Sequence, residues 1–325
     1  MRENPCLPAP LVGAVPIRQE MEGYLDWEKE KLQYRPEEIW ELELPEKIRR
    51  ILLLIKLNLG TNPHIFIKGQ DLRSGELPLV INGLRKEGWD NIQASTSTIL
   101  DGTIRRNPIL KISSDVERED YQGLLMNCGK EFTGTLKGQS KFIFKGEFGS
   151  DSKEVTEWFW DNSMFIFYPN RWDKKEKTIV GGGFSIETEL TTPKRDRSES
   201  MKMEAASGCM GRDVGLFGPG IPGYRYKGVG EADYYLGFGL ITTNALVKES
   251  QGIELSDLNL ERLRDTAMYN LWRKLTRDPN FRSSLRTLQL VLETNEIIVD
   301  WYYHEDDSWP DSHKIVCIDF DWVDR

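Results

Sequence analysis

Cysteine and histidine are scarce in this chain, and their scarcity narrows the chemistry that the sequence can support. Four cysteines occur among 325 residues, and no two of them form a Cys-x-x-Cys pair. A chain of this size folds without disulfide bridges, so reduced thiols are expected. Only three histidines are present, which leaves few candidates for histidine-based catalysis or metal binding.

Long apolar stretches and targeting signals are also missing. The longest apolar run, Ile51–Ile55, is far shorter than the roughly 20 residues that a membrane helix needs. The stretch 1–16 is interrupted by prolines and lacks the continuous apolar region of a signal peptide. No Asn-x-Ser/Thr glycosylation site occurs. The sequence therefore predicts a cytoplasmic protein without membrane insertion.

Basic residues are fewer than acidic residues in this chain. Lysine and arginine total 43 against 52 acidic residues, which gives a formal net charge of -9 at pH 7. Such a balance repels nucleic-acid phosphates and anionic lipids unless basic residues are segregated. The densest basic stretch, 194–197, is interrupted by Asp196, as is typical of a solvated loop. The composition therefore argues against a nucleic-acid partner.

Alternation of apolar and polar residues with a period of two dominates the middle of the chain. Phe142, Phe144 and Phe148 interleave with charged residues, and Phe184 and Ile186 interleave with Ser185 and Glu187. Successive side chains of a strand point to opposite faces, so this pattern predicts antiparallel sheets with one buried face. The fold class expected is α+β, with a large β-sandwich or barrel as the main body.

The N-terminal part, residues 1–105, is predicted to be mainly helical. Apolar residues recur at helical spacing within 20–59, and Gly60 ends that helix. A short β-α-β-like passage follows, with strands at 65–67 and 91–94 around a helix at 77–86. Residues 106–325 form the predicted β-rich body, either as a second domain or as one body with the first.

The β-rich body is divided into short predicted strands. They lie near 109–113, 132–137, 141–148, 154–160, 163–168, 178–190, 201–206, 224–229, 233–243, 288–292, 297–303 and 315–322. A helix is predicted at 256–276, because its apolar residues follow helical spacing until Pro279. This helix is expected to cover the outer face of the sheet.

Two glycine-rich segments resemble nucleotide-binding loops without their context. Gly218–Gly223 satisfies Gly-x-Gly-x-x-Gly, but prolines interrupt it and a predicted strand follows in place of a helix. The turn Lys68–Gly75 lacks the Gly-Lys-Ser/Thr ending of a phosphate loop. Both are interpreted as structural connections, and the sequence identifies no cofactor.

An aromatic cluster is the main candidate for a binding site. Aromatic walls on adjacent strands commonly line pockets for apolar or aromatic molecules. Packing in the core is the competing interpretation. The lining residues predicted for such a pocket are Trp158, Trp160, Phe165, Phe167 and Tyr226.

A second candidate site lies in the segment 304–313. It combines imidazoles and carboxylates, the ligand types that suit zinc, manganese or iron. The predicted ligands are His304, Asp307, Asp311 and His313. A solvated acidic loop between two strands is the competing interpretation.

No motif identifies a reaction, so three hypotheses stay open. The first is a protein that holds a small apolar or aromatic molecule in a β-rich pocket, as a binding protein or a non-hydrolytic enzyme. The second is a protein-interaction module, for instance in defence, immunity or assembly, with a protein partner. The third is a metal-dependent enzyme that uses the loop 304–313.

Overall fold

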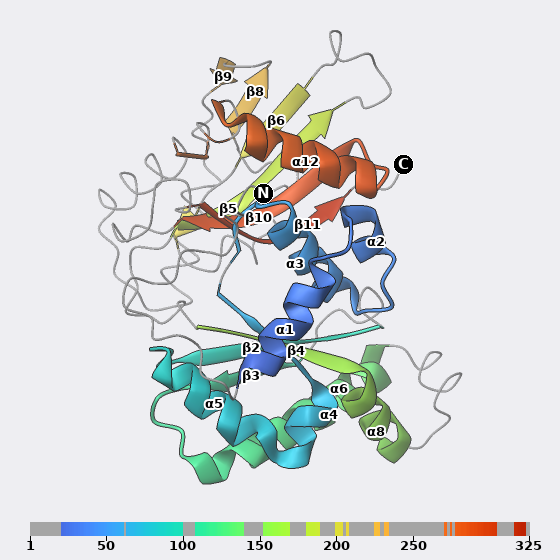
Figure 1. The fold of residues 1–325 in the computed structure, drawn as a ribbon, viewed down its shortest axis with the longest axis vertical. Coiled ribbons are helices and arrows are strands. Elements are labelled where there is room, and N and C mark those ends of the chain that lie inside the picture. Colours follow the sequence, from blue (N-terminus) through green and yellow to red (C-terminus); the bar gives the residue numbers. More distant parts are fainter. Residues whose placement is uncertain are drawn as a thin grey trace. The chain divides into compact units, whose positions relative to one another are not determined.

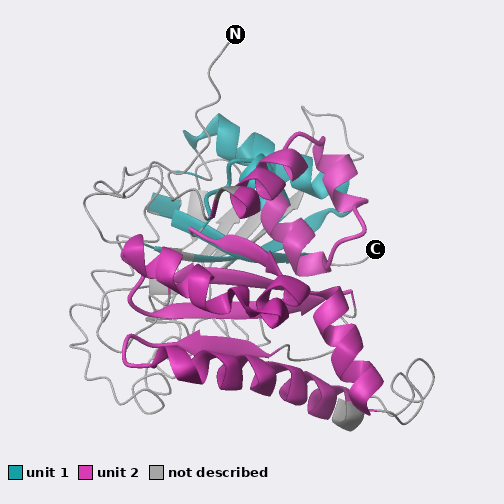
Figure 2. Cartoon of the chain, turned by 60° about the horizontal axis from the view of Figure 1, so that its bottom comes forward, with its two compact units in different colours: residues 1–12, 53–62, 172–325 teal, residues 13–52, 63–171 magenta. Residues whose placement is uncertain are grey.

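A computed structural model of the chain describes most of its N-terminal half and selected strands and helices of the rest. The described residues are 21–61, 63–99, 108–139, 152–169, 180–188, 199–203, 206–207, 224–227, 231–233, 270–271, 274, 277–303 and 315–322. The chain divides into two compact units, coloured separately in Figure 2. Unit 1 comprises residues 1–12, 53–62 and 172–325, and unit 2 comprises residues 13–52 and 63–171.

Unit 2 is built on an antiparallel four-stranded sheet with the strand order β1-β4-β2-β3. Its strands are β1 (Ile65–Lys68), β2 (Ile92–Thr98), β3 (Ile109–Ile112) and β4 (Ser163–Pro169). One face of this sheet carries α4 (Gly69–Asp71), η2 (Leu72–Glu76), α5 (Leu77–Lys86), α6 (Tyr121–Gln139) and α8 (Ser152–Asn162) (Figure 1). The short η3 (Arg118–Asp120) leads into α6. The predicted strands at 65–67, 91–94, 109–113 and 163–168 and the helix at 77–86 are therefore confirmed.

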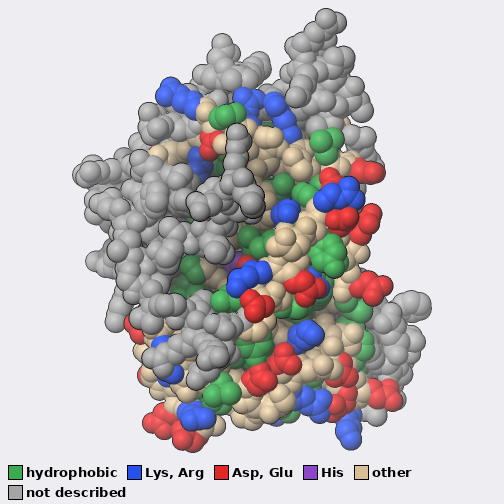
Figure 3. Space-filling model, viewed as in Figure 1, with side chains coloured by type: hydrophobic (Ala, Val, Ile, Leu, Met, Phe, Trp, Pro, Cys, Tyr) green, Lys and Arg blue, Asp and Glu red, His purple; other side chains and the backbone are tan. Residues whose placement is uncertain are grey.

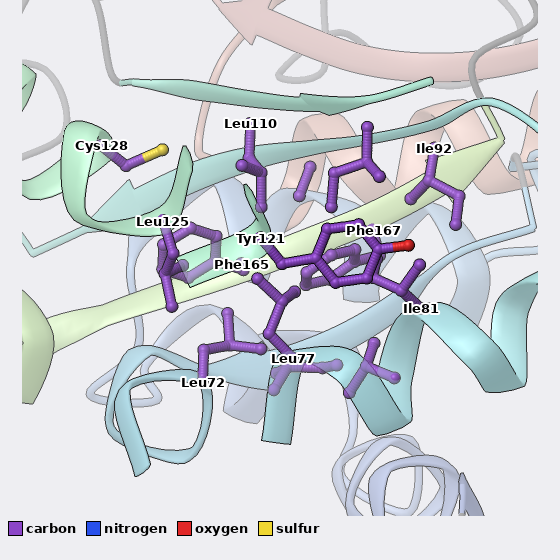
Figure 4. Close-up of a cluster of buried hydrophobic side chains, with 14 of the residues drawn as sticks. Leu72, Leu77, Ile81, Ile92, Leu110, Tyr121, Leu125, Cys128, Phe165 and Phe167 are labelled. Carbon is purple, nitrogen blue, oxygen red and sulfur yellow. The ribbon is translucent and has the colours of Figure 1, made fainter. Parts of the chain in front are cut away.

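The core of unit 2 lies between this sheet face and the helices. Alternate residues of the strands, such as Ile65, Ile67, Phe165 and Phe167, point into it. Apolar side chains of α5 and α6 meet them from the other side, as Figure 4 shows for Ile81 and Leu125. Because an amphipathic helix buries one stripe, each helix covers the sheet while its charged face stays in water.

In unit 2, two segments predicted as strands are helices, and those predictions were wrong. Residues 132–137 belong to α6, and residues 154–160 belong to α8. In α6 the buried apolar side chains are Tyr121, Leu125, Cys128, Phe132 and Leu136, which follow helical spacing over the element. A short apolar run does not by itself distinguish a buried helix from a strand. The two are distinguished by the length over which the helical spacing continues.

The remaining N-terminal helices are α1 (Glu22–Lys31), α2 (Pro36–Trp40) and α3 (Glu46–Lys56). They confirm helical structure within 20–59, although as three helices in place of one. The division between the units falls within α3, after Leu52. Gly60 follows with a φ of 80°, a left-handed conformation that glycine adopts without strain and that ends helices.

Unit 1 contains a larger antiparallel sheet with the order β11-β10-β5-β6-β8-β9, and β7 pairs with β5 outside that path. Its strands are β5 (Val180–Thr188), β6 (Glu199–Met203), β7 (Ala206–Ser207), β8 (Tyr224–Lys227), β9 (Glu231–Asp233), β10 (Glu296–Tyr303) and β11 (Ile315–Trp322). Helix α12 (Pro279–Val291) crosses this sheet (Figure 1), and Phe281 packs 6.3 Å from Phe184 of β5 between ring centroids.

The strand predicted at 288–292 was wrong, because most of these residues belong to helix α12. Helical residues of the preceding segment are described up to Arg277, so that helix ends before Pro279, as predicted. Pro279 then begins α12, because proline is tolerated in the first helical turn. The carboxylate of Asp278 caps this helix by accepting hydrogen bonds from the backbone of Asn280 and Phe281. Leu285 and Leu288 are fully buried at helical spacing, whereas Leu290, which gave the alternating pattern at 288–292, is 62% exposed.

Several predicted elements lie wholly or mostly outside the described residues. The strand at 141–148 is one, and most of the helix at 256–276 is another, although residues 270, 271 and 274 within that range are helical. The fold combines helices with antiparallel sheets, as predicted. Neither sheet closes into a barrel through the described strands, and the sandwich stays a prediction. In the described part of the chain, no helix is long and apolar enough to cross a membrane.

Candidate functional site

The structure places the predicted aromatic lining residues in two different units. Trp160, Phe165 and Phe167 belong to the core cluster of unit 2 and are at most 1% exposed. The rings of Trp160 and Phe165 stack with centroids 6.1 Å apart, and Trp158 packs on the edge of the cluster against Phe132. Tyr226 lies on β8 in unit 1.

Packing around Trp160 is tight. A Cβ atom at Gly129 would lie only 3.1 Å from the Trp160 ring, so α6 approaches the indole as closely as a glycine permits. The indole Nε1 of Trp160 is buried there without a hydrogen-bond partner. These contacts favour a structural role for the aromatic cluster, and its role in lining a pocket stays a prediction.

The predicted metal ligands His304, Asp307, Asp311 and His313 lie outside the described residues. The metal site at this loop therefore stays a prediction. Over the residues that the structure does describe, no group of three or more His, Cys, Asp or Glu side chains could hold a metal ion.

The opposite face of the four-stranded sheet carries a different set of side chains. Because strand residues alternate, the neighbours of the core residues point away from the core cluster. We call this side the His64 face and define it by His64, Phe66, Ile166, Tyr168, Gln93 and Ser95. Phe66, Ile166 and Ser95 are buried there, whereas Ile109 and Lys111 on the same side of β3 are exposed, so the face is buried toward β1 and β4 and open to water at β3.

Polar side chains form a row across the His64 face. Tyr168 pairs with Gln93, and Gln93 pairs with Lys111, in the register of three neighbouring strands. His64 directly precedes the pair Ile65–Phe167 and is therefore placed opposite Tyr168. The Gln93 amide donates a hydrogen bond of 2.9 Å to the Tyr168 hydroxyl. The row thus runs from His64 through Tyr168 and Gln93 to Lys111.

Helix α1 completes one end of this row. Glu28 places Oε2 3.3 Å from Nε2 of His64, close enough for an ion pair when the imidazole is protonated. Trp27, the residue before Glu28, meets Phe66 edge to face with ring centroids 5.7 Å apart. The His64 ring also lies 4.7 Å from that of Phe66. A largely buried histidine–carboxylate pair therefore lies beside two aromatic rings.

This arrangement can exchange protons and hydrogen bonds, but it does not form a serine-hydrolase site. Ser95 lies on β2, and β4 separates that strand from β1 and His64. Two strand spacings amount to about 9–10 Å, far beyond hydrogen-bond reach between a nucleophile and its base. Histidine, tyrosine and glutamine side chains together suit the orientation of a bound polar group.

A second polar cluster holds the other end of α1. The Tyr24 hydroxyl donates a hydrogen bond to the Glu76 carboxylate, and burial together with Glu76 raises the pKa of Tyr24. Burial also raises the pKa of Asp71, and the nearby Glu76 charge adds to that effect. This cluster joins α1 to the η2–α5 connection and takes no part in the polar row.

Sequence reasoning missed the His64 face because its members are far apart in the chain. Glu28, His64, Gln93 and Tyr168 belong to four different elements, and no local spacing links them. Only the register of β1, β4 and β2 brings three of them into one row. The one signal in the sequence was the scarcity of histidine. With only three histidines in the chain, His64 was one of few candidates for a functional histidine.

No sequence profile of a known protein family matches the chain, and no curated protein matches it as a relative.

Proposed function

We propose that this protein binds a small molecule with an apolar or aromatic body and one polar group, on the His64 face of unit 2. The observation that carries the proposal is the row of hydrogen-bonding side chains on a largely buried sheet face, with Phe66 and Ile166 beside it. Ligand sites are mostly apolar, with a few polar groups that fix the orientation of the ligand.

The polar groups of the row determine what kind of ligand fits. The imidazole of His64 can donate or accept a hydrogen bond, and Glu28 stabilises its protonated form. Tyr168 and Gln93 provide a hydroxyl and an amide, held to each other by their own hydrogen bond. Phe66 presents an aromatic ring next to His64, which suits stacking against a flat ligand.

The test uses three probes that share a benzene ring and differ in the polar group: benzoate, benzamide and phenol. Their dissociation constants are measured by calorimetry for the wild-type protein and for His64→Gln. At least one probe should bind the wild type, and His64→Gln should weaken it by about tenfold, the effect of losing one hydrogen bond to a charged group. Native mass spectrometry of the purified protein checks for a retained ligand.

Glu30→Gln is the matched control, because Glu30 lies on the same helix and is exposed to solvent. This control should bind the probes as the wild type does. The proposal fails if no probe binds and no small molecule is retained. A probe that binds the wild type and His64→Gln equally would place the site elsewhere.

Interaction with a protein partner has weaker support. Ile99, directly after β2, and Ile109 of β3, on the same side of the sheet as the His64 face, are exposed, with exposed fractions of 58% and 48%. Single exposed apolar residues are common on proteins and do not by themselves mark an interface. On the face that Figure 3 shows, acidic and basic side chains of the described residues are interspersed, which is the pattern of an ordinary solvated surface.

A further inference from the structure

Lys274 of unit 1 is a partly buried lysine whose amine lacks an acidic partner. Within the described part of the chain, no carboxylate lies within ion-pair distance of it. Its Nζ instead lies 3.5 Å from the carbonyl oxygen of Ile315 and 5.5 Å from the centroid of the Phe281 ring. A buried ammonium without a carboxylate is costly, so this environment favours the neutral amine.

Among the described residues, few charged or titratable groups act on Lys274. Burial lowers its pKa, Asp278 of the α12 cap partly opposes that effect, and Cys317 of β11 would oppose it only as a thiolate. Cys317 is itself fully buried, which raises the pKa of its thiol to about 12. Asp300 acts on Cys317 in the same direction. The thiol therefore stays protonated and supplies no negative charge to hold the lysine in its charged form.

Trp301 adds an independent observation on the same face of the sheet. Its Cα pairs with that of Cys317 across β10 and β11, and Ile315 lies two residues from Cys317 on the same strand. Trp301 is 1% exposed, yet its indole Nε1 has no hydrogen-bond partner. A buried donor without an acceptor is unfavourable and is a place where a bound oxygen atom would be accommodated.

From this geometry we propose that Lys274 is a nucleophilic amine and that, with the indole N–H of Trp301, it forms a site for small carbonyl compounds in unit 1. A neutral lysine in apolar surroundings reacts with carbonyl carbon to form a Schiff base. The amine nitrogen forms a bond to that carbon, and the carbonyl oxygen leaves as water after taking up two protons. The Trp301 N–H donates a hydrogen bond to the carbonyl oxygen during the attack.

The experiment treats the full chain with benzaldehyde and sodium cyanoborohydride at pH 7. Hydride from the reductant converts each protonated imine to a stable secondary amine, which peptide mass spectrometry locates and quantifies over time. Lys274 should be modified several-fold faster than exposed Lys86 of α5, because a lowered pKa raises the fraction of neutral amine at pH 7. The rate at Lys274 should also reach its half-maximum below the pH expected of an ordinary lysine amine.

Two variants separate the roles of the two residues. Lys274→Arg should abolish this fast modification, while Trp301→Phe should slow modification of Lys274 several-fold and leave Lys86 unchanged. Circular dichroism establishes that both variants remain folded, and the wild-type ratio of Lys274 to Lys86 decides the proposal if one of them does not. Modification of Lys274 at or below the rate of Lys86 overturns the proposal. If Lys274 is modified at the same rate in Trp301→Phe as in the wild type, the indole of Trp301 is not part of the proposed site.

Discussion

At the scale of single residues, two glycines of unit 2 differ in the space around them: Gly69 has no room for a side chain, and Gly134 has open space. A Cβ atom on Gly69 would lie 2.2 Å from Oγ of Ser163 and 2.7 Å from the carbonyl oxygen of Trp160, whereas a Cβ atom on Gly134 would meet nothing within 4 Å. Gly69→Ala should therefore destabilise the protein by about 1–3 kcal/mol, since a backbone atom must move. Gly134→Ala should stabilise it by about 0.5–1 kcal/mol, because alanine favours helix.

Urea unfolding measured by circular dichroism checks both substitutions. The two glycines serve as controls for each other, because the change of side chain is identical and only the surroundings differ. Equal free energies of unfolding for Gly69→Ala and Gly134→Ala would contradict the close packing of α4 against the start of β4.

At the scale of elements, α1 is held to unit 2 by a few mixed contacts. Met21 packs at its start, with Sδ 3.1 Å from the position of a Cβ atom on Gly83 of α5. Tyr24 bonds to Glu76, and Glu28 lies by His64. Tyr24→Phe removes one hydrogen bond and leaves the Glu76 carboxylate without that donor, at a cost of about 1 kcal/mol. Amide hydrogen exchange within α1 should therefore become about fivefold faster.

Tyr34→Phe provides the matched control for this measurement. Tyr34 follows the same helix, but 38% of it is exposed. Its substitution should leave exchange within α1 unchanged. Faster exchange that is equal in α1 and in α6 would indicate global destabilisation and would contradict a local anchoring role for Tyr24.

At the scale of the whole molecule, the two units are interleaved along the chain. Residues 53–62 belong to unit 1, although residues of unit 2 surround them in sequence. Leu53, Leu54 and Leu59 are fully buried, and the backbone N–H of Cys317 donates a hydrogen bond of 3.0 Å to Gly60 O. The segment 53–62 is therefore joined to β11 by a backbone hydrogen bond, and its buried leucines contribute to the core of unit 1.

The segment 53–62 should be required for unit 1 to fold on its own. A fragment of residues 172–325 should unfold without a cooperative transition, because it lacks three buried leucines, each worth about 1.5–3 kcal/mol. The same fragment with residues 53–62 fused through a Gly/Ser linker should regain a cooperative transition in thermal unfolding. A fusion in which Leu53, Leu54 and Leu59 are replaced by serine is the control. Cooperative unfolding of the unfused fragment would contradict the assignment of 53–62 to unit 1.

The sequence by itself determined those elements whose signals are local. The alternating run of β5, the continuous apolar run of β4 and the helical stripe of α3 are each contained in one short segment. Turn residues such as Gly60 also act locally, because glycine relieves a backbone conformation at its own position. Such features were predicted from spacing alone.

Tertiary structure alone decided the rest, because the deciding contacts join distant residues. Whether Phe132 and Phe159 would lie on strands or helices depended on the whole length of α6 and α8 and on the sheet that they cover. The polar row of the His64 face requires the order β1-β4-β2, which places His64, Tyr168 and Gln93 side by side. No local spacing encodes that order, since pairing of strands is fixed by packing across the sheet.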